Sequence, residues 1–317
     1  MIPAPSAPSL LLSFYGDDFT GSTDVMEALS ANGVETVLYL DIPDAALLQR
    51  FAHCRALGIA GTSRSESPAW MEANLVPVLA WLKARNAAIC HYKVCSTFDS
   101  SPATGNIGKA VEIGRDVFEQ AAVPLLVGAP QLRRYTVFGT LFAAYRGEVY
   151  RLDRHPVMSR HPVTPMREAD LRLHLKEQSR LQCGLVDAVT LRADDADSRI
   201  DRIAGGPDGM ILFDVDDAQS QRHAGRQLWR LRRDGGWFVA GSSGVEYALL
   251  AAWRENGLAG GPRSYALPGK AARIAVVSGS VSPTTESQIR HALANGFKAI
   301  ALDPLELLGE TGPAAVE

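Results

Sequence analysis

Two adjacent carboxylates, Asp17 and Asp18, directly follow an apolar run in the sequence. Residues 10–15 (LLLSFY) are typical of a buried strand, and the apolar spacing of residues 21–32 predicts the helix that follows. The aspartates then lie in a β-α loop at the carboxyl edge of an open α/β sheet, where ligands bind beside a helix N-terminus that can hold an anion. Carboxylates at that position favour a ligand-binding site.

The same residues also allow a purely structural interpretation. Asp17, Asp18 and Thr20 have the side chains that form turns and cap helices. Against this, the strands expected in the first half of the chain all end in Gly, Ser, Thr, Asp or Lys, as at residues 61–65 (GTSRS) and 93–97 (KVCST). Polar groups gathered along one sheet edge favour a binding site over a set of unrelated turns.

Composition excludes several classes of protein. The chain has 317 residues, of which 46% are hydrophobic and 21% charged, so it can bury the core of one large domain or two. The 32 basic and 35 acidic residues give a net charge of −3 without a basic block, which argues against binding to a nucleic-acid backbone. The four cysteines have no C-x-x-C spacing, so we expect reduced thiols and neither disulfides nor a metal site; they are Cys54, Cys90, Cys95 and Cys183.

The sequence also gives an expectation about the compartment. No apolar run reaches the length that spans a membrane, so no membrane partner is expected. The first nine residues (MIPAPSAPS) are rich in proline and lack the basic and apolar regions of a signal peptide. These features predict a cytoplasmic protein.

Strand-like and helix-like segments alternate along the chain and predict an α/β fold, a mostly parallel sheet covered by helices. The expected strands are residues 10–15, 36–40, 56–60, 88–94, 124–128, 185–190, 210–215 and 237–240. The expected helices are residues 21–32, 44–53, 68–86, 105–120, 218–234 and 244–256. A further helix after Glu168 carries Leu171 and Leu175 on one face.

A stretch rich in Gly and Pro, residues 257–270, is the clearest linker. We therefore expect an N-terminal lobe over residues 1–257, a linker over 258–271 and the beginning of a second α/β lobe over 272–317. In the second lobe, strands are expected at residues 273–277 and 297–302, with a helix at 283–295 between them. Because one βαβ unit is too small for a stable domain, its apolar faces predict a homodimer that exchanges this segment.

The middle of the chain has a basic segment stiffened by three prolines, residues 149–167. Each proline holds the residue before it in β or polyproline geometry, so we expect an extended segment. Arg154 and Arg160 are candidates for anion contact, because guanidinium groups match carboxylates and phosphates. A solvated surface loop is the alternative. His155 and His161 match no standard pattern of metal ligands.

Four separated segments of the chain resemble the four-carbon acid sugar kinases. They are DDFTGSTD at residues 17–24, GTSR at 61–64, YKVCSTFDSSP at 92–102 and YRLDRHPVMSRHPVTPMREADL at 150–171. The resemblance extends over about residues 10–308. The last two segments look like the 3-oxo-tetronate kinase branch, whereas threonate and erythronate kinases more often carry Asp in place of Cys95 and Arg near Asp99.

The resemblance implies a two-lobed enzyme that transfers phosphate from ATP, with Mg²⁺, to the terminal hydroxyl of a 3-oxo-tetronate. Asp17 or Asp18 would accept the proton of the attacking hydroxyl or orient it, and which of them does so stays open. Arg64 and Lys93 are our first choices for the substrate anion, with Ser96 and Thr97 helping. The full set of expected substrate contacts is Thr20, Arg64, Lys93, Ser96, Thr97, Arg154 and Arg160.

The ATP site is expected in the second lobe. Residues 278–282 (SGSVS) precede a helix and can present backbone N–H groups to phosphate, which makes Ser278, Gly279, Ser280 and Ser282 the candidate nucleotide contacts. Residues 241–244 (GSSG) have the same local form, with ordinary helix entry as the simpler interpretation. The later glycine-rich ATP loop of the family does not occur before Glu317, so we expect either a fragment or a protein that binds the acid without phosphorylating it.

A phosphatase of the haloacid dehalogenase type is a third alternative, since such enzymes also begin with a strand that ends in aspartates. That chemistry requires Asp-x-Asp-x-Thr, whereas here the carboxylates of Asp17 and Asp18 are adjacent and expected to point in different directions. This alternative ranks below the kinase and the acid-sugar binding protein.

Overall fold

The computed structural model of the chain describes residues 10–266, 269–280 and 282–303. The chain divides into two compact units, Met1–Ser264 and Tyr265–Glu317. Each unit is described by itself. Among the described residues, no helix is both long enough and apolar enough to cross a bilayer.

The first unit is built on an eight-stranded sheet in the order β2-β3-β1-β4-β11-β5-β10-β9. All the strand pairs of this sheet are parallel, so their carboxyl ends meet at one edge. The predicted α/β fold with a mostly parallel sheet is confirmed. The strands are β1 (Leu12–Gly16), β2 (Thr36–Tyr39), β3 (Ala56–Ala60), β4 (Ile89–Lys93), β5 (Val123–Leu126), β9 (Cys183–Val186), β10 (Met210–Phe213) and β11 (Trp237–Gly241).

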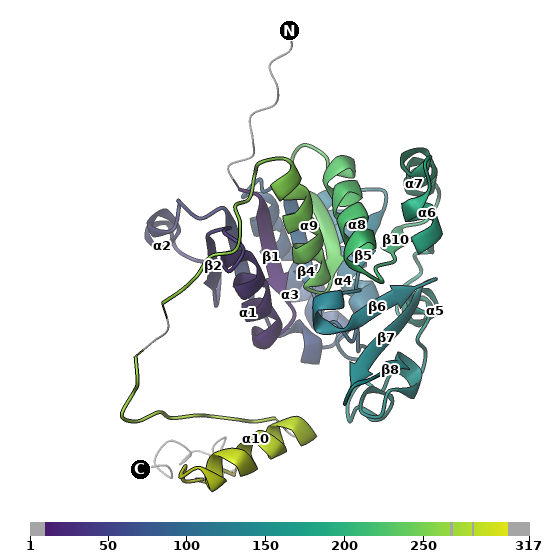
Figure 1. The fold of residues 1–317 in the computed structure, drawn as a ribbon. Coiled ribbons are helices and arrows are strands. Elements are labelled where there is room, and N and C mark those ends of the chain that lie inside the picture. Colours follow the sequence, from purple (N-terminus) through teal and green to yellow (C-terminus); the bar gives the residue numbers. More distant parts are fainter. Residues whose placement is uncertain (1–9, 267–268, 281, 304–317) are drawn as a thin grey trace. The chain divides into compact units, whose positions relative to one another are not determined.

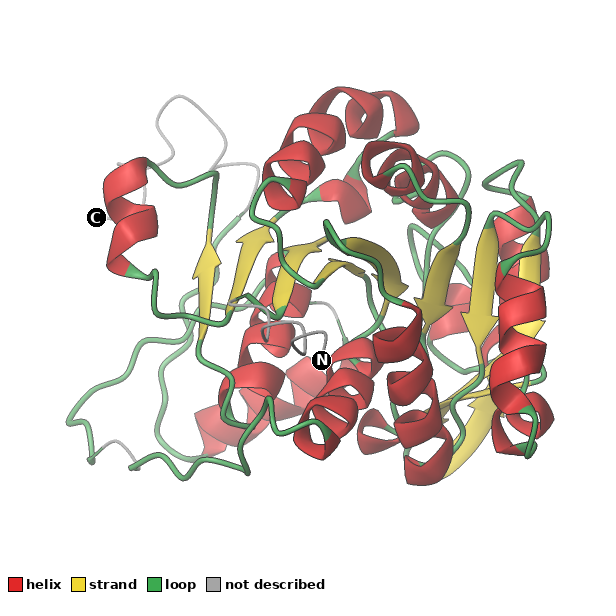
Figure 2. Ribbon diagram, turned by 90° about the horizontal axis from the view of Figure 1, so that it is seen from above, coloured by secondary structure: helices red, strands yellow, loops and turns green. Residues whose placement is uncertain are grey.

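Helices cover both faces of this sheet (Figures 1 and 2). In Figure 1, α1, α8 and α9 lie in front of the sheet, and α3 and α4 lie behind it. The helices of the first unit are α1 (Phe19–Ser30), α2 (Ala45–Arg50), α3 (Pro68–Lys83), α4 (Ile107–Phe118), α5 (Leu171–Lys176), α6 (Ala188–Arg192), α7 (Ala196–Ala204), α8 (Ala218–Leu231) and α9 (Gly244–Glu255). The helices predicted at residues 21–32, 68–86, 105–120, 218–234 and 244–256 agree with α1, α3, α4, α8 and α9 within a few residues.

The strands are apolar on both faces because each face packs on helices, as parallel sheets require. In β1, Leu12 and Phe14 join the core under α1, α8 and α9, whereas Tyr15 joins the core under α3 and α4. Successive strand side chains point to opposite faces, so the run of residues 10–15 supplies both cores at once. This rigid sandwich fixes the position of the loops at its carboxyl edge.

A three-stranded antiparallel sheet lies beside the main sheet and was not predicted from the sequence. It consists of β6 (Arg134–Val137), β7 (Thr140–Tyr145) and β8 (Glu148–Arg151). Two-residue turns join its strands, and both residues of each turn have positive φ, 50° and 79° in the first and 49° and 96° in the second. Asp214, which follows β10, accepts backbone N–H bonds from both residues of the first turn, Phe138 (2.5 Å) and Gly139 (3.0 Å), and so attaches this small sheet to the main one.

Two further expectations need correction. The segment 149–167 is not simply extended, because it contains 3-10 turns at Leu152–Arg154 and Met158–Arg160. The residues that precede its first two prolines, His155 and His161, do have the predicted extended backbone, with ψ of 128° and 133°. The strand expected at residues 185–190 ends at Val186, because Asp187 caps a helix, α6, by accepting the N–H of Thr190.

In the second unit, α10 (Pro283–Ala294) agrees with the predicted helix at 283–295. The strands expected at residues 273–277 and 297–302 are wrong, since these segments have no strand assignment in the structure. Their larger apolar side chains are exposed, including Val277 at 91% and Ile300 at 84%. A strand is assigned through ladder hydrogen bonds to a neighbour, and the described residues of this unit supply none to either segment.

Candidate active site

Backbone hydrogen bonds bring three strand ends together around Asp17. Its N–H donates to the carbonyl of Lys93 at the end of β4 (2.9 Å), and its carbonyl accepts from the N–H of Arg64 (3.0 Å) in the 3-10 turn after β3. Gly16 precedes Asp17, and a Cβ at this glycine would lie 2.0 Å from the Ser22 hydroxyl of α1. The close approach of strand and helix therefore requires glycine.

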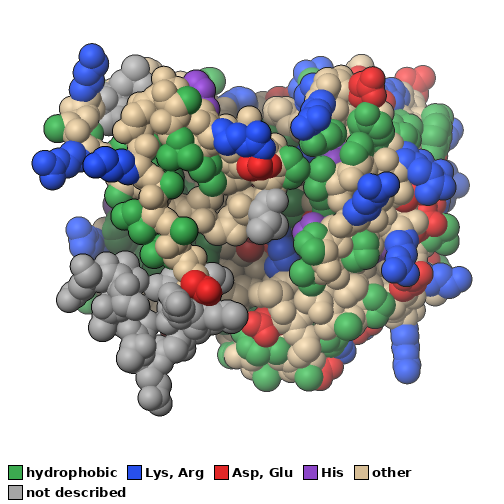
Figure 3. Space-filling model, turned by 90° about the horizontal axis from the view of Figure 1, so that it is seen from below, with side chains coloured by type: hydrophobic (Ala, Val, Ile, Leu, Met, Phe, Trp, Pro, Cys, Tyr) green, Lys and Arg blue, Asp and Glu red, His purple; other side chains and the backbone are tan. Residues whose placement is uncertain are grey.

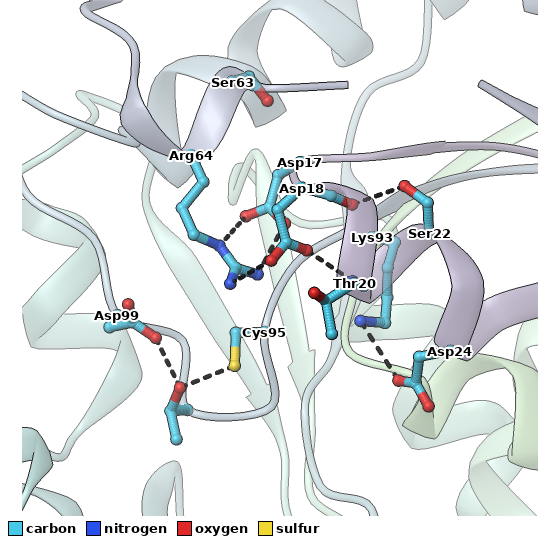
Figure 4. A network of polar contacts seen from close by, with 12 residues as sticks. Asp17, Asp18, Thr20, Ser22, Asp24, Ser63, Arg64, Lys93, Cys95 and Asp99 are labelled. Carbon is cyan, nitrogen blue, oxygen red and sulfur yellow. Dashed lines mark hydrogen bonds and ion pairs between the residues drawn. The ribbon is translucent and has the colours of Figure 1, made fainter. Parts of the chain in front are cut away.

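A single guanidinium group joins the two adjacent carboxylates (Figure 4). Arg64 Nη2 lies 2.8 Å from Asp17 Oδ1 and Arg64 Nε lies 3.1 Å from Asp17 Oδ2, which makes a two-pronged ion pair. Arg64 Nη1 lies 2.9 Å from Asp18 Oδ2. The expectation that the carboxylates of Asp17 and Asp18 point apart is therefore wrong, because both reach the same cation.

The two aspartates have different surroundings. Asp17 is only 4% exposed, and burial raises the pKa of its carboxyl to about 6, against the opposing effect of Arg64. Asp18 is partly exposed and caps α1, since its Oδ1 accepts the N–H of Gly21 at 2.7 Å. The capping interpretation of the sequence thus holds for Asp18, whereas Asp17 is a buried carboxylate with a perturbed pKa, the kind of group that clusters at functional sites.

Lys93 supplies the second cation of the site. Its side chain is almost completely buried, and its Nζ lies 3.5 Å from Asp24 Oδ2 on α1. A Cβ at Gly21 would lie 3.1 Å from this Nζ, so the first turn of α1 packs directly on the ammonium group. Arg64 and Lys93 are therefore both held by protein carboxylates, although we expected both to contact the substrate anion.

The loop after β4 forms a second polar group beside Arg64. Thr97 Oγ1 lies 2.5 Å from Asp99 Oδ1 and 2.9 Å from Cys95 Sγ. Thr164 Oγ1 donates to Asp99 Oδ2 at 3.2 Å. Asp99 thus connects this loop to the proline-rich segment, and sequence reasoning missed it despite its place in the STFDSS run.

The structure gives less direct evidence about the other expected site residues. Thr20 is exposed at the start of α1, and Ser96 is partly buried next to Thr97. Arg154 and Arg160 are exposed on 3-10 turns, and Arg154 lies 3.8 Å from Asp153. Within the described residues, none of these four side chains forms a hydrogen bond or ion pair with the Asp17–Arg64 group, so their substrate roles stay predictions.

The expected nucleotide contacts lie in the second unit. Ser278, Gly279 and Ser280 are exposed, and Ser282 caps α10 by accepting the N–H of Thr285 at 3.1 Å. Helix capping is a sufficient reason for this last serine, so the nucleotide role of the segment stays a prediction. On the face shown in Figure 3, Lys and Arg side chains are interspersed with Asp and Glu.

Comparison with known proteins identifies the family. A model of the sugar-binding N-terminal domain matches residues 12–249, which include β1 to α9 except for a few terminal residues. The chain belongs to the four-carbon acid sugar kinase family, as the sequence motifs indicated.

Two curated relatives illustrate the similarity. A 3-oxo-isoapionate kinase of Paraburkholderia graminis is 50% identical over 309 residues, covering 97% of this chain and 66% of the relative. A 3-oxo-tetronate kinase of Cupriavidus necator is 31% identical, covering 94% of this chain and 67% of the relative. The chain thus spans about two thirds of the length of these kinases.

Solved structures share the fold. A Salmonella typhimurium protein matches with a TM-score of 0.74 at 25% identity, covering 98% of this chain and 70% of that one. A Bordetella bronchiseptica protein with a domain of unknown function (DUF1537) matches with a TM-score of 0.62 at 20% identity, covering 98% of this chain and 71% of that one. That crystal structure is of a domain-swapped dimer with bound citrate. At this identity the likeness shows the fold alone, and a dimer of the present chain stays a prediction.

Proposed function

We propose that the protein is an ATP-dependent kinase of a 3-oxo acid sugar, and that the edge of the sheet around Asp17 binds this sugar. The observation that carries the proposal is the buried Asp17 carboxylate, which accepts two hydrogen bonds from Arg64 Nε and Nη2. This pair occurs in a chain that belongs to a family of acid sugar kinases. The names of both relatives specify a 3-oxo acid sugar. Since identity is 50% to the 3-oxo-isoapionate kinase and 31% to the 3-oxo-tetronate kinase, 3-oxo-isoapionate is the first substrate to test.

The geometry supports different roles for the two aspartates. We assign to Asp17 the contact with the attacking hydroxyl, because a carboxylate with a pKa of about 6 is ionised at neutral pH and can still accept a proton. Arg64 fixes the orientation of this carboxylate. Asp18 accepts a hydrogen bond from Nη1 of the same guanidinium and caps the first turn of α1. In a loose phosphoryl-transfer transition state, such positioning contributes more than base strength.

Mg²⁺ would enter the reaction with the phosphates of ATP. Asp17 and Asp18 do not fit a metal-binding pair, because each has an oxygen bonded to Arg64. Within the described residues, no group of three or more His, Cys, Asp or Glu side chains is arranged to hold a metal ion. The chemistry assigned to this chain is therefore the binding of the sugar and the orientation of its hydroxyl.

The test is a phosphotransfer assay with the protein as its gene encodes it. ADP release should require the acid sugar, with 3-oxo-isoapionate, 3-oxo-tetronate and threonate compared at equal concentration. Asp17→Asn should mainly lower kcat, whereas Asp18→Asn should mainly raise KM, because the first contacts the reacting hydroxyl and the second supports the site. Asp44→Asn is the matched control, since Asp44 caps α2 on the surface and asparagine keeps the cap.

Two outcomes would contradict the proposal. Saturable binding of the acid sugars without ADP release would favour the alternative of a non-catalytic acid-sugar binding protein. Near wild-type kinetics in both aspartate variants would reduce the segment 17–24 to a helix cap.

A further inference from the structure

The charges around Asp17 leave no cation for the carboxylate of the substrate. Arg64 is shared by Asp17 and Asp18, and Lys93 lies against Asp24, so three carboxylates surround two cations. A fourth carboxylate placed among them would be repelled, since like charges at such distances disfavour one another. An unpaired cation elsewhere on the same sheet edge is therefore the better partner for the acid group of an acid sugar.

Arg134, the first residue of β6, is a cation without an acidic partner. It forms no ion pair with any carboxylate in the described ranges. Its Nη1 donates to the carbonyls of Leu132 (2.9 Å) and Arg133 (3.3 Å). Its Nε is buried and has no hydrogen-bond partner among the described residues. Burial of this uncompensated charge lowers the pKa of Arg134, whereas the neighbouring carboxylates raise that of Arg64 despite its burial.

Arg134 lies toward the same edge as Asp17. The Cys95 side chain, in the loop after β4, interacts electrostatically with both Arg64 and Arg134. β6 starts beyond the carboxyl end of β5, and Ala129 of that connection pairs with Arg134. In the order β1-β4-β11-β5, the first and last strands are three intervals apart, which is about 14 Å. A long arginine side chain and a four-carbon acid together can span such a distance.

We propose that Arg134 binds the carboxylate of the acid sugar and thereby directs its far hydroxyl toward Asp17. The carboxylate would accept from the Nε–Nη2 side of the guanidinium, which makes no hydrogen bond in the described structure, while Nη1 stays on the backbone carbonyls. Arginine suits this role because its planar fork matches a carboxylate with two parallel bonds. The assignment rests on the proposed function and names the group of the substrate that this residue recognises.

The experiment compares a charged ligand with its uncharged analogue. Calorimetry of the wild-type protein is carried out with threonate and with threonamide, which differ in the carboxylate alone. We expect wild type to prefer the acid, Arg134→Gln to bind the acid about 10- to 100-fold more weakly, and threonamide to bind both proteins within about threefold. Arg133→Gln is the matched control, because the neighbouring Arg133 is exposed and its Nη2 donates to the Gly147 carbonyl at 3.0 Å.

A structural role for Arg134 predicts a different result. Loss of its bonds to the turn carbonyls would lower the melting temperature and weaken both ligands equally, which would overturn the assignment. Arg134→Lys keeps the charge without the fork and should retain part of the preference for the acid, so the proposal stays testable if Arg134→Gln does not fold. If wild type and Arg134→Gln bind threonate with equal affinity, the role of Arg134 is refuted and the proposed function is not. Wild type that binds no acid sugar would refute the proposed function as well.

Discussion

Ionisation of Asp17 should set the acidic limb of the pH profile. Burial raises the pKa of this carboxyl from 3.8 to about 6, which corresponds to about 3 kcal/mol of destabilisation of the ionised form. If the ionised form contacts the attacking hydroxyl, kcat/KM should fall as the pH is lowered through about 6. Asp17 would be about 91% ionised at pH 7 and about 9% at pH 5, so the expected loss between these values is about tenfold.

The assay is kcat/KM for the acid sugar at saturating ATP, because this quantity reports the groups of the enzyme before the sugar binds. Asp214 is the competing source of such a limb, since burial raises its pKa to about 6 as well. It binds the turn between β6 and β7, so Asp214→Asn should alter stability and keep the limb. A limb that survives in Asp17→Asn, or a profile that is flat from pH 5 to 7 in wild type, would refute the assignment of Asp17.

Three further changes test the same site. Arg64→Gln should move the acidic limb to higher pH, because the charge of Arg64 lowers the pKa of Asp17; a limb that does not move would show that this charge has no such effect. Asp18→Ala should lower the free energy of unfolding by about 0.5–2 kcal/mol through loss of the cap on α1, whereas Asp18→Asn should keep it, as urea denaturation can measure. Gly21→Ala should cost about 1–3 kcal/mol in the same measurement, because its Cβ would lie 2.5 Å from Asp18 Oδ1; a stable variant would show that the first turn of α1 can shift.

Most of the main sheet could be predicted from local patterns. Residues 56–60 were expected as a strand and are β3 (Ala56–Ala60), and the other predicted strands before residue 130 differ from the structure by at most two residues at either end. In a sequence, fully buried parallel strands appear as short apolar runs, and helices appear as apolar residues spaced three and four apart. Both signals are therefore contained in a few neighbouring residues.

The three-stranded sheet could not be predicted in the same way. Its two tight turns are Phe138–Gly139 and Arg146–Gly147. Each turn consists of a non-glycine residue followed by a glycine, and both residues have positive φ. The usual hairpin signal is Asn-Gly or Asp-Gly, which the sequence does not have at either turn. Asp214, more than seventy residues away, binds the first turn, so the contact that holds it is not visible in its own sequence.

The sequence by itself determined that carboxylates follow β1 and that Arg64 and Lys93 follow or end neighbouring strands, since residue order and periodicity place them at one sheet edge. Tertiary structure alone decided which of these charges are compensated. Arg64 lies 46 and 47 positions from the aspartates that hold it, and burial, together with their different hydrogen bonds, distinguishes Asp17 from Asp18. Electrostatic pairing and burial depend on distances in space, which local sequence patterns do not contain, and for this reason the unpaired Arg134 became visible only in the folded chain.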